Sequence, residues 1–390
     1  MPWETRTVKM SRETFVADIK SGEKSKSQLC REYGISRVTG DKWLKRFENG
    51  ETLDDRSKAP FHVQNKTPPE KESKILEVRT AHPAWGPRKI RQFLINKGED
   101  VPSKSTIGNI LTRNGCISEA ASKAATPYKR FQKESCNEMW QTDFKGHFAM
   151  ENGKRCHPLT VLDDHSRFSL CVDAKENEQR EGVCKSFERL FEENGLPDSL
   201  LCDNGPPWGT SQTMGYTIFE VWLMEYGILP IHGRFKHPQT QGKEERFHLT
   251  MKNELLRHTQ IRNMAHAQIC FDNFRNCYNN ERPHEALNMG VPVDFYKVSK
   301  RRKPDKIEEW EYANEFVLRK VKSSGYITYL GQGYFLSEAF KEKTIAIRES
   351  SLENCINIYY RNFKIARINL RERAFVSRRI YKFDSPAECE

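Results

Sequence analysis

The chain has 390 residues, of which 37% are hydrophobic and 30% charged. This length suggests two to four domains at roughly 150 residues each, and the composition is too apolar for a chain that is disordered throughout. No run approaches the ~18 apolar residues that a membrane-spanning helix needs, and the first ten residues, MPWETRTVKM, lack the apolar core of a signal peptide. We therefore expect neither a membrane protein nor a secreted one, and no membrane partner.

The cysteine pattern favours reduced thiols inside a cell. The 11 cysteines are odd in number, scattered along the chain and never spaced C-x-x-C. This pattern indicates neither a zinc finger nor a disulfide framework, and disulfides are rare in the cytosol.

The positive charge is concentrated in the amino-terminal third of the chain. Residues 1–130 contain 26 Lys and Arg against 16 Asp and Glu, whereas residues 131–390 contain 38 against 37. A basic region followed by a nearly neutral remainder indicates that the basic part binds a polyanion such as a nucleic acid. Many solvated surfaces are also basic, so the charge alone leaves both interpretations open.

Residues 11–50 have the pattern of three short helices, SRETFVADIK, SKSQLCREYG and SRVTGDKWLKRF. Ser25 and Ser36 suit helix N-caps, and Gly34 suits the left-handed turn before the third helix. In the helix-turn-helix motif a third helix placed in this way lies in the DNA major groove. The alternative is an ordinary three-helix bundle with one basic face.

The predicted third helix has an inner and an outer side. We expect three hydrophobic residues around it to face inward: Ile35, Val38 and Trp43. We expect four polar residues to lie on the outer, DNA-binding side: Arg37, Thr39, Lys42 and Arg46. Gly40 is a local weakness of this helix, because glycine costs about 1 kcal/mol relative to alanine.

A second set of three helices follows, at residues 70–81, 87–97 and 103–114. Pro87 suits the first turn of its helix, Ser103 suits an N-cap, and Gly115 would end the last helix. Four polar residues of that last helix are candidates for DNA contact: Lys104, Ser105, Asn109 and Arg113. Two linked units could span a long DNA site and gain affinity from linked binding.

From about residue 137 strands and helices alternate. Three strand-like segments come first, EMWQTDFKGHFAM, LTVLDDHSRF and FSLCVDA, followed by the amphipathic helix QREGVCKSFERLFEEN and the apolar strand DSLLCDNG. A helix near 217–226, a strand near 228–231 and a long helix from about 241 to 259 complete the block. Three antiparallel strands followed by alternating helices and strands favour an α/β mixed sheet of the ribonuclease H type.

Beyond Trp310 the chain is rich in short β-type runs. Five or six such runs separated by Gly, Ser and Asn suit a small all-β, barrel-like domain. We therefore predict a multidomain chain with six parts: a helix-turn-helix domain (1–50), a linker (51–66), a second helix-turn-helix-like domain (67–115), a linker (116–135), a ribonuclease H-like core (136–300) and a C-terminal β-barrel-like domain (301–390).

Three acidic residues lie where they could act together. Asp143 lies within the strand WQTDF, where a carboxylate is costly unless something pairs with it. Asp203 ends the strand SLLCDNG, and Glu245 lies early on the helix that begins within HPQTQGKEERF. Carboxylates from two strands and a helix can converge on hard divalent cations. Two such ions about 3.5–4 Å apart can activate a water or a sugar hydroxyl and stabilise the leaving oxygen at a phosphorus atom.

Five segments carry a family resemblance: WQTDF, VLDDHSRF, LCDNG, HPQTQGKEERFH and YNNERPHEAL. They closely resemble the integrase-type D-D-E transposases of insertion sequences, whose core is related to that of retroviral integrases. The resemblance covers about residues 137–297, and WGPRKI and GYITYLGQGYFLSEAF extend it more weakly toward both ends. It implies a ribonuclease H-like core, Mg²⁺ or Mn²⁺ as a pair of ions, and two phosphoryl-transfer steps on DNA. It also implies that Asp143, Asp203 and Glu245 are the catalytic and metal-binding residues.

The third acid has a neighbour, Glu244, that could take its place. The family motif puts the catalytic acid directly before the Arg of an E-R-F/H segment, which selects Glu245. On a helix Glu245 shares a face with Lys252, which could reach a phosphate of the DNA end; a solvated lysine is the alternative. The 41 residues between Asp203 and Glu245 exceed the spacing usual in the family, and GTSQTMGYTIFEVWLME could absorb the excess.

Four further polar residues are assigned structural roles. We expect Asp163 and Asp164 to form and support a turn at the end of a strand, with an auxiliary role in the active site as the alternative. We expect Arg282 and His284 to dock their loop onto the core rather than act on substrate.

The resemblance implies a transposase that binds the terminal inverted repeats of a mobile element in double-stranded DNA. Such an enzyme nicks the element ends and joins their 3′-hydroxyls to target DNA. Joining two ends implies a dimer or larger homo-oligomer on DNA, and the family implies the bacterial cytoplasm. Two alternatives stay open: a domesticated DNA-binding regulator without catalytic activity, against which the three acids argue, and a non-specific metal-dependent nuclease.

Overall fold

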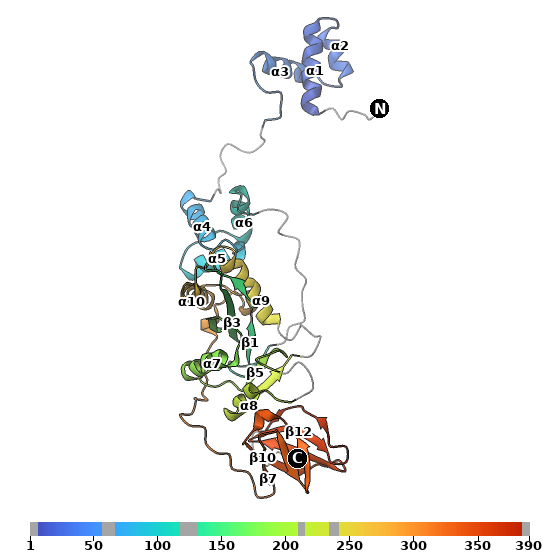
Figure 1. The fold of residues 1–390 in the computed structure, drawn as a ribbon. Helices are drawn as coiled ribbons and strands as arrows, with labels where there is room; N and C mark the ends of the chain where they lie inside the picture. Colours follow the sequence, from blue (N-terminus) through green and yellow to red (C-terminus); the bar gives the residue numbers. More distant parts are fainter. Residues whose placement is uncertain (1–6, 57–66, 118–131, 210–214, 234–241, 384–390) are drawn as a thin grey trace. The chain divides into compact units, whose positions relative to one another are not determined.

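The structure is a computed structural model that describes residues 7–56, 67–117, 132–209, 215–233 and 242–383. The chain divides into two compact units, Met1–Lys66 and Thr67–Glu390. The larger unit contains a helical region, a mixed sheet with helices and an antiparallel β-region, in that order along the chain (Figure 1). Much of both predicted linkers lies outside the described residues, so the six-part division stays a prediction.

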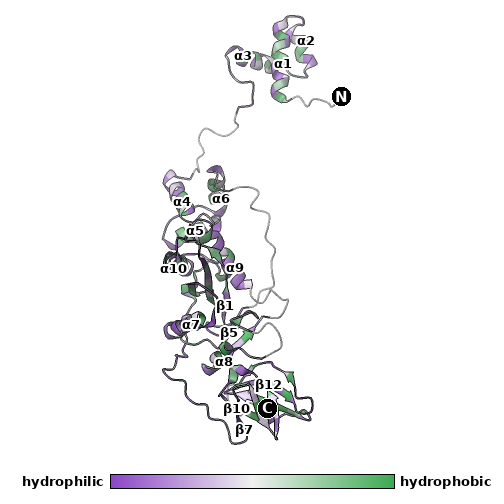
Figure 2. Ribbon diagram, viewed as in Figure 1, coloured by the Kyte–Doolittle hydropathy of each residue, from purple (hydrophilic) through white to green (hydrophobic). Residues whose placement is uncertain are grey.

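The smaller unit has the three predicted helices, α1 (Val8–Ser21), α2 (Lys26–Glu32) and α3 (Arg37–Glu48). Ser25 and Ser36 are N-caps as predicted, because their hydroxyls accept hydrogen bonds from the backbone N–H groups of Gln28 and Thr39. Hydrophobic and hydrophilic residues are mixed on these helices (Figure 2). The buried hydrophobic residues form the core of the unit: Phe15, Val16, Leu29, Cys30, Trp43 and Leu53.

Two predictions about α3 are wrong. Val38 does not face inward, since 79% of its surface is exposed. Arg46 does not lie on the outer side, since it is only 7% exposed and donates a hydrogen bond to the carbonyl oxygen of Thr52 at 2.6 Å. Both errors have one cause: the buried stripe of α3 runs through Gly40, Trp43 and Arg46 at three-residue spacing. Arg46 therefore leaves the predicted set of DNA contacts.

Gly40 has a packing role that the sequence did not reveal. A Cβ atom at this position would lie 2.8 Å from Sγ of Cys30 and 3.0 Å from Cζ of Phe15. Glycine is therefore required for α3 to pack this closely against α1 and α2, which offsets its low helix propensity.

The larger unit begins with α4 (Pro69–Ala81), α5 (Pro87–Asn96) and α6 (Lys104–Arg113), close to the predicted ranges. Pro87 occupies the first position of α5, and the Ser103 hydroxyl caps α6 by accepting from the N–H of Thr106. The hydrophobic core of this helical region consists of Ile75, Trp85, Ile90, Leu94, Ile107, Ile110 and Leu111.

The central sheet combines antiparallel and parallel pairing. Its strands are β1 (Trp140–Phe144), β2 (Phe148–Ala149), β3 (Arg155–Asp163), β4 (Ser169–Lys175), β5 (Ser199–Cys202) and β6 (Leu229–His232). Their order is β2-β3-β1-β5-β6, and β4 pairs with the other edge of β3. Strands β1, β3 and β4 pair antiparallel, whereas β5 pairs parallel with both β1 and β6.

Helices cover both faces of this sheet. Helices α7 (Arg180–Asn194) and α8 (Ile218–Glu225) pack against β1 and β5 in one core. Helices α9 (Gly242–Met251) and α10 (Met264–Asn280) pack against β3 and β4 in another. The predicted helix over 241–259 is shorter than expected, because α9 ends at Met251 and continues as a π-helical turn, Lys252–Leu256. Two short 3₁₀ turns follow α10, Glu285–Leu287 and Pro292–Asp294.

The C-terminal region is antiparallel. Its strands are β7 (Val317–Lys320), β8 (Tyr326–Tyr329), β9 (Gln332–Phe335), β10 (Thr344–Glu349), β11 (Cys355–Tyr360), β12 (Phe363–Asn369), β13 (Ala374–Ser377) and β14 (Tyr381–Lys382). Strands β8 and β9 form a hairpin, and the other six form one sheet. Its core also includes Tyr216, Val221 and Met224 from in and around α8, so this region and the central sheet share packed side chains.

The structure confirms the predicted fold class of helix-turn-helix helices, a ribonuclease H-like mixed sheet and an all-β region. Within the described residues, no helix is both long enough and apolar enough to cross a bilayer.

Candidate active site

The first predicted acid, Asp143, lies on the central strand β1. Its backbone pairs with Thr160 of β3, and its side chain is partly buried. The pKa of Asp143 is raised to about 7, mainly by burial and also by the negative charges of Asp203, Glu178 and Glu245. All three predicted acids are therefore close enough to interact electrostatically at Asp143.

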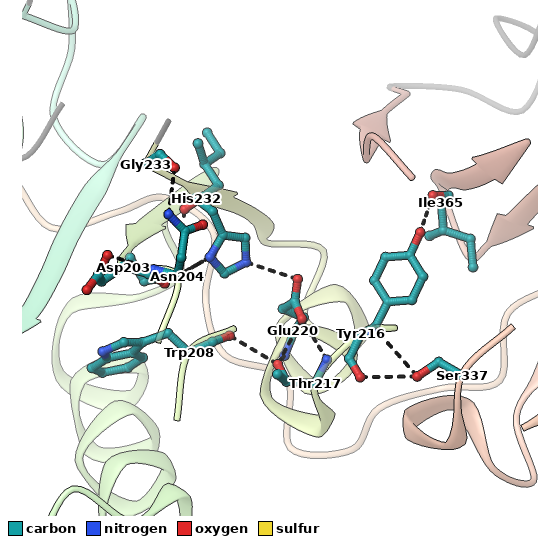
Figure 3. Close-up of polar contacts among 12 residues, drawn as sticks. Asp203, Asn204, Trp208, Tyr216, Thr217, Glu220, His232, Gly233, Ser337 and Ile365 are labelled. Carbon is teal, nitrogen blue, oxygen red and sulfur yellow. Dashed lines mark hydrogen bonds and ion pairs between the residues drawn. The ribbon is translucent and has the colours of Figure 1, made fainter. Parts of the chain in front are cut away.

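The second acid, Asp203, directly follows β5, the parallel neighbour of β1. Its side chain is exposed, and its Oδ1 accepts a hydrogen bond from the N–H of Asn204 at 2.7 Å. The Asn204 side chain in turn donates to the carbonyl oxygen of Gly233 at 2.9 Å, which ties this loop to the end of β6 (Figure 3). Because β5 runs parallel to β1 and pairs with it, Asp203 at the end of β5 lies beside Asp143 of β1.

The two neighbouring glutamates that compete for the role of the third acid have different surroundings. Glu245 is exposed on α9, whereas Glu244 is fully buried against the sheet. The Thr160 hydroxyl donates to Oε2 of Glu244 at 3.0 Å, and Oε1 of Glu244 has no hydrogen-bond partner among the described residues. Burial and the negative charge of Asp143 raise the pKa of Glu244 well above its usual value. A fully buried Glu244 is a poor candidate for a ligand that must meet DNA, and Glu245 stays the predicted acid.

A histidine that the sequence did not single out joins this group. His248 lies one turn after Glu244, with Nδ1 3.9 Å from Oδ2 of Asp143 and Nε2 2.8 Å from the Thr160 hydroxyl. Burial, with the nearby charge of Lys145, lowers the pKa of His248 to about 3, so the ring is neutral. The signal available in the sequence was its i+4 spacing from Glu244 on one helix face.

The donor set fits a hard divalent cation. Carboxylate oxygens are the ligands that Mg²⁺ and Mn²⁺ prefer, and a cation would relieve the repulsion that raises the pKa of Asp143. The carboxylate oxygens of Asp143, Asp203 and Glu245 are not all within 4.8 Å of one another in this structure, however. In the part of the chain that the structure describes, the only three potential ligand atoms all within 4.8 Å of one another belong to His82, Cys277 and Glu281, elsewhere in the larger unit.

The predicted DNA-contact residues divide by exposure. Arg37 and Lys42 are exposed on α3, while the Thr39 hydroxyl is 2.9 Å from that of its N-cap, Ser36. On α6, Lys104, Ser105 and Asn109 are exposed, and Arg113 forms an ion pair with Glu72. These assignments stay predictions.

The larger unit has two further basic features, a pair of lysines and a cavity. Burial, and to a lesser extent the charge of the exposed Lys252, lowers the pKa of the half-buried Lys145, so these two cations are close enough to interact. A cavity of about 670 Å³ lies between the helical region and the segment after α10. Its lining residues are Arg88, Arg91, Gln92, Ser103, Lys104, Glu285, Asn288 and Met289.

The residues assigned structural roles have structural contacts. Asp163 accepts hydrogen bonds from Ser166 and from the N–H of Asn137, which closes the turn after β3. Asp164 is fully buried and is paired with Lys243. Arg282 donates three hydrogen bonds to the Glu254 carboxylate at 2.9–3.0 Å, as a docking residue would.

Models of known families match most of the chain. Integrase core domain models match residues 133–238 and 226–292. The C-terminal domain of IS481 family transposases matches residues 317–375, and helix-turn-helix and homeodomain-like models match residues 12–61 and 39–111. The chain thus has an integrase core domain, followed by a region that matches the C-terminal domain of IS481 family transposases.

Relatives of this chain are encoded by several bacterial insertion elements. The 31.7 kDa protein of IS407 from Burkholderia multivorans is 28% identical over 159 residues, which are 41% of this chain and 55% of that protein. The 39.2 kDa protein of IS476 from Xanthomonas euvesicatoria is 25% identical over 227 residues, 57% of this chain and 63% of that protein. The chain thus spans between half and two thirds of the length of these relatives.

Solved structures of retroviral integrases are also similar. The catalytic core domain of HTLV-2 integrase in complex with magnesium is 16% identical, and the match covers 43% of this chain and all of that chain at a TM-score of 0.34. The simian T-cell lymphotropic virus intasome in complex with the PP2A regulatory subunit B56 gamma is 13% identical over 74% of this chain and 96% of that chain, with a TM-score of 0.36.

Proposed function

We propose that this chain is a transposase that binds the terminal inverted repeats of its element, nicks the ends and joins their 3′-hydroxyls to target DNA. The observation that supports this most directly is the electrostatic coupling at Asp143. A partly buried carboxylate in mid-strand, with a pKa raised to about 7 by burial and by three further acids, two of them the other predicted ligands, is suited to bind a cation.

Each residue has a role that follows from its place. Asp143, Asp203 and Glu245 would hold Mg²⁺ or Mn²⁺, in one or two ions. Such an ion, when bound, polarises the phosphate and lowers the pKa of the attacking water or hydroxyl. Lys145 and Lys252 attract the DNA phosphate toward the carboxylates.

DNA recognition is assigned to the helical regions. Exposed Arg37 and Lys42 on α3 and exposed Lys104, Ser105 and Asn109 on α6 would contact phosphates and base edges. Because each element has two ends, the active form is a dimer or a larger homo-oligomer on DNA.

The test is a cleavage and strand-transfer assay on oligonucleotides that carry the native element ends, with Mg²⁺ or Mn²⁺. Asp143→Asn removes the coupled carboxylate with little change in shape, so cleavage should fall at least 1,000-fold, about 4 kcal/mol of activation free energy, while end binding stays within twofold. Glu178→Gln is the control, because Glu178 also acts electrostatically on Asp143 but lies outside the proposed triad.

The possible results separate three functions. Strand transfer by the unmodified chain supports the transposase, and tight binding without cleavage would instead indicate a regulator. Cutting that does not depend on the end sequence would indicate a nuclease. Cleavage that persists in Asp143→Asn would show that the site is assigned wrongly.

A further inference from the structure

The Asp203 backbone is held by a partly buried histidine. Nδ1 of His232, at the end of β6, lies 3.0 Å from the carbonyl oxygen of Asp203, and Nε2 lies 3.0 Å from Oε1 of Glu220 on α8 (Figure 3). The carbonyl oxygen of Asp203 can only accept, so Nδ1 donates to it, and Nε2 pairs with the carboxyl group of Glu220. Only 23% of the His232 side chain and 7% of the Glu220 side chain is exposed.

Close packing limits the movement of this histidine. A Cβ on Gly209 would lie 3.0 Å from Cε1 of His232, so the backbone of residue 209 closes one side of the ring. Sγ of Cys202, which directly precedes Asp203, lies 3.8 Å from Nδ1. The ring therefore bridges the ends of β5 and β6 rather than facing solvent.

Glu220 is itself fixed by the start of α8. Its Oε2 accepts hydrogen bonds from the N–H and the hydroxyl of Thr217, and the Thr217 hydroxyl accepts from the N–H of Glu220. This reciprocal arrangement is a capping box. The preceding residue, Tyr216, exchanges hydrogen bonds with Ser337 of the C-terminal region (Figure 3), so α8 is anchored on both sides.

We propose that His232 and Glu220 are positioning residues that hold the backbone of Asp203, and with it the Asp203 carboxylate, in the place required for metal binding. The inference rests on the proposed function of Asp203. The Asp203 side chain is exposed and its described hydrogen bond lies within its own loop, so its position depends on its backbone, which His232 contacts directly and which the neighbouring Asn204–Gly233 hydrogen bond also ties to β6. Partners that orient a metal ligand in this way typically contribute 10–100-fold to metal affinity, on the order of 1.4–2.7 kcal/mol.

The test is Mn²⁺ binding by calorimetry on the full chain, together with the Mn²⁺ concentration for half-maximal cleavage of element ends. Glu220→Gln removes the charge but keeps the capping box, because glutamine also suits that position. Glu220→Gln and His232→Gln should each weaken Mn²⁺ binding about tenfold. Glu225→Gln is the matched control, since Glu225 lies on the same helix but pairs with Lys343 and Tyr360 of the C-terminal region; it should change binding less than twofold.

Asp203→Asn distinguishes a failure of the positioning role from a failure of the proposed metal site. If Asp203→Asn abolishes Mn²⁺ binding while Glu220→Gln and His232→Gln bind as the unmodified chain does, the positioning role is overturned and the proposed function stands. If Asp203→Asn binds Mn²⁺ normally, the proposed metal site itself fails. Thermal unfolding of every variant is recorded, and equal weakening in Glu225→Gln would show general loosening of α8 and would also overturn the inference.

Discussion

The two helical regions have the same three-helix pattern but complete their cores differently. The core of α1–α3 is built from residues between Phe15 and Leu53. The core of α4–α6 also packs against Cys277 of α10, and the indole N–H of Trp85 donates to Glu254, 169 residues further along the chain. The same local pattern thus gives a separate unit in one case and a part of a larger unit in the other.

Buried charge accounts for much of this difference. Glu254 lies in the π-helical turn after α9 and accepts hydrogen bonds from both Trp85 and Arg282. Lys89 of α5 approaches the same carboxylate at 3.7 Å. The Arg282 side chain is 7% exposed and that of Glu254 13%, so this cluster is shielded from water. In α1–α3 the ion pairs Lys9–Asp54 and Lys24–Glu32 are exposed and contribute little.

The largest effect is expected at this cluster. Glu254→Gln keeps the shape of the side chain but leaves the charges of Arg282 and Lys89 buried without their partner. Removing one member of a buried ion pair typically costs about 3–5 kcal/mol, so the free energy of unfolding of the larger unit should fall by about 3 kcal/mol. Urea denaturation measures this, and hydrogen exchange should accelerate in α4–α6 but not in α1–α3.

Glu72→Gln provides the control for this variant. Glu72 pairs with Arg113 within the helical region, at side chains that are 20% and 46% exposed, and its loss should cost less than about 1 kcal/mol. Equal losses in both variants would show that the buried cluster is not what joins α4–α6 to the core.

The second effect is a dependence of stability on pH. Burial, together with the charge of Arg282, lowers the pKa of Lys89 from 10.5 to about 8. Between pH 8 and 10.5 the unfolded chain therefore binds more protons than the folded chain, and stability rises with pH through this window. We expect a gain of about 2 kcal/mol between pH 7.5 and 10 relative to Lys89→Met, measured by urea denaturation at each pH.

Lys24 of the smaller unit provides a contrast to Lys89, because its pKa is shifted in the opposite direction. A hydrogen bond from Lys24 to Glu32, and the charge of Glu32, raise the pKa of Lys24. Its contribution is therefore present at neutral pH and is lost as pH rises through the raised pKa, opposite to that of Lys89. A difference between the unmodified chain and Lys89→Met that stays flat from pH 7.5 to 10 would contradict the buried state of Lys89.

The helices and strands could be predicted from the sequence because they follow from local pattern, and the three proposed acids were assigned from their places on these elements. Asp143, Asp203 and Glu245 lie within a strand, at a strand end and on a helix, and those elements can be recognised from neighbouring residues. The contacts of Glu244 with Thr160 and of Trp85 with Glu254 span 84 and 169 residues, and no local periodicity encodes them. The position of Val38 was predicted wrongly for a related reason. Helical periodicity gives the spacing of buried residues, but it does not show which face of α3 is buried when two of the three buried residues are a glycine and an arginine.

The smallest effect compares the glycines of the two third helices. Alanine at Gly40 would press its Cβ onto Cys30 and the fully buried Phe15, whereas at Gly108 the nearest atom would be Cγ of Pro87 at 3.7 Å, an ordinary contact. Overpacking costs about 1–3 kcal/mol and alanine gains about 1 kcal/mol in a helix, so Gly40→Ala should destabilise its unit by about 1 kcal/mol and Gly108→Ala should stabilise its own by up to about 1 kcal/mol. Urea denaturation followed by segment-resolved hydrogen exchange measures both, and opposite signs are the required outcome. If both variants were stabilised, α3 would not pack against α1 and α2 as closely as described, and the self-contained core of the smaller unit would need another explanation.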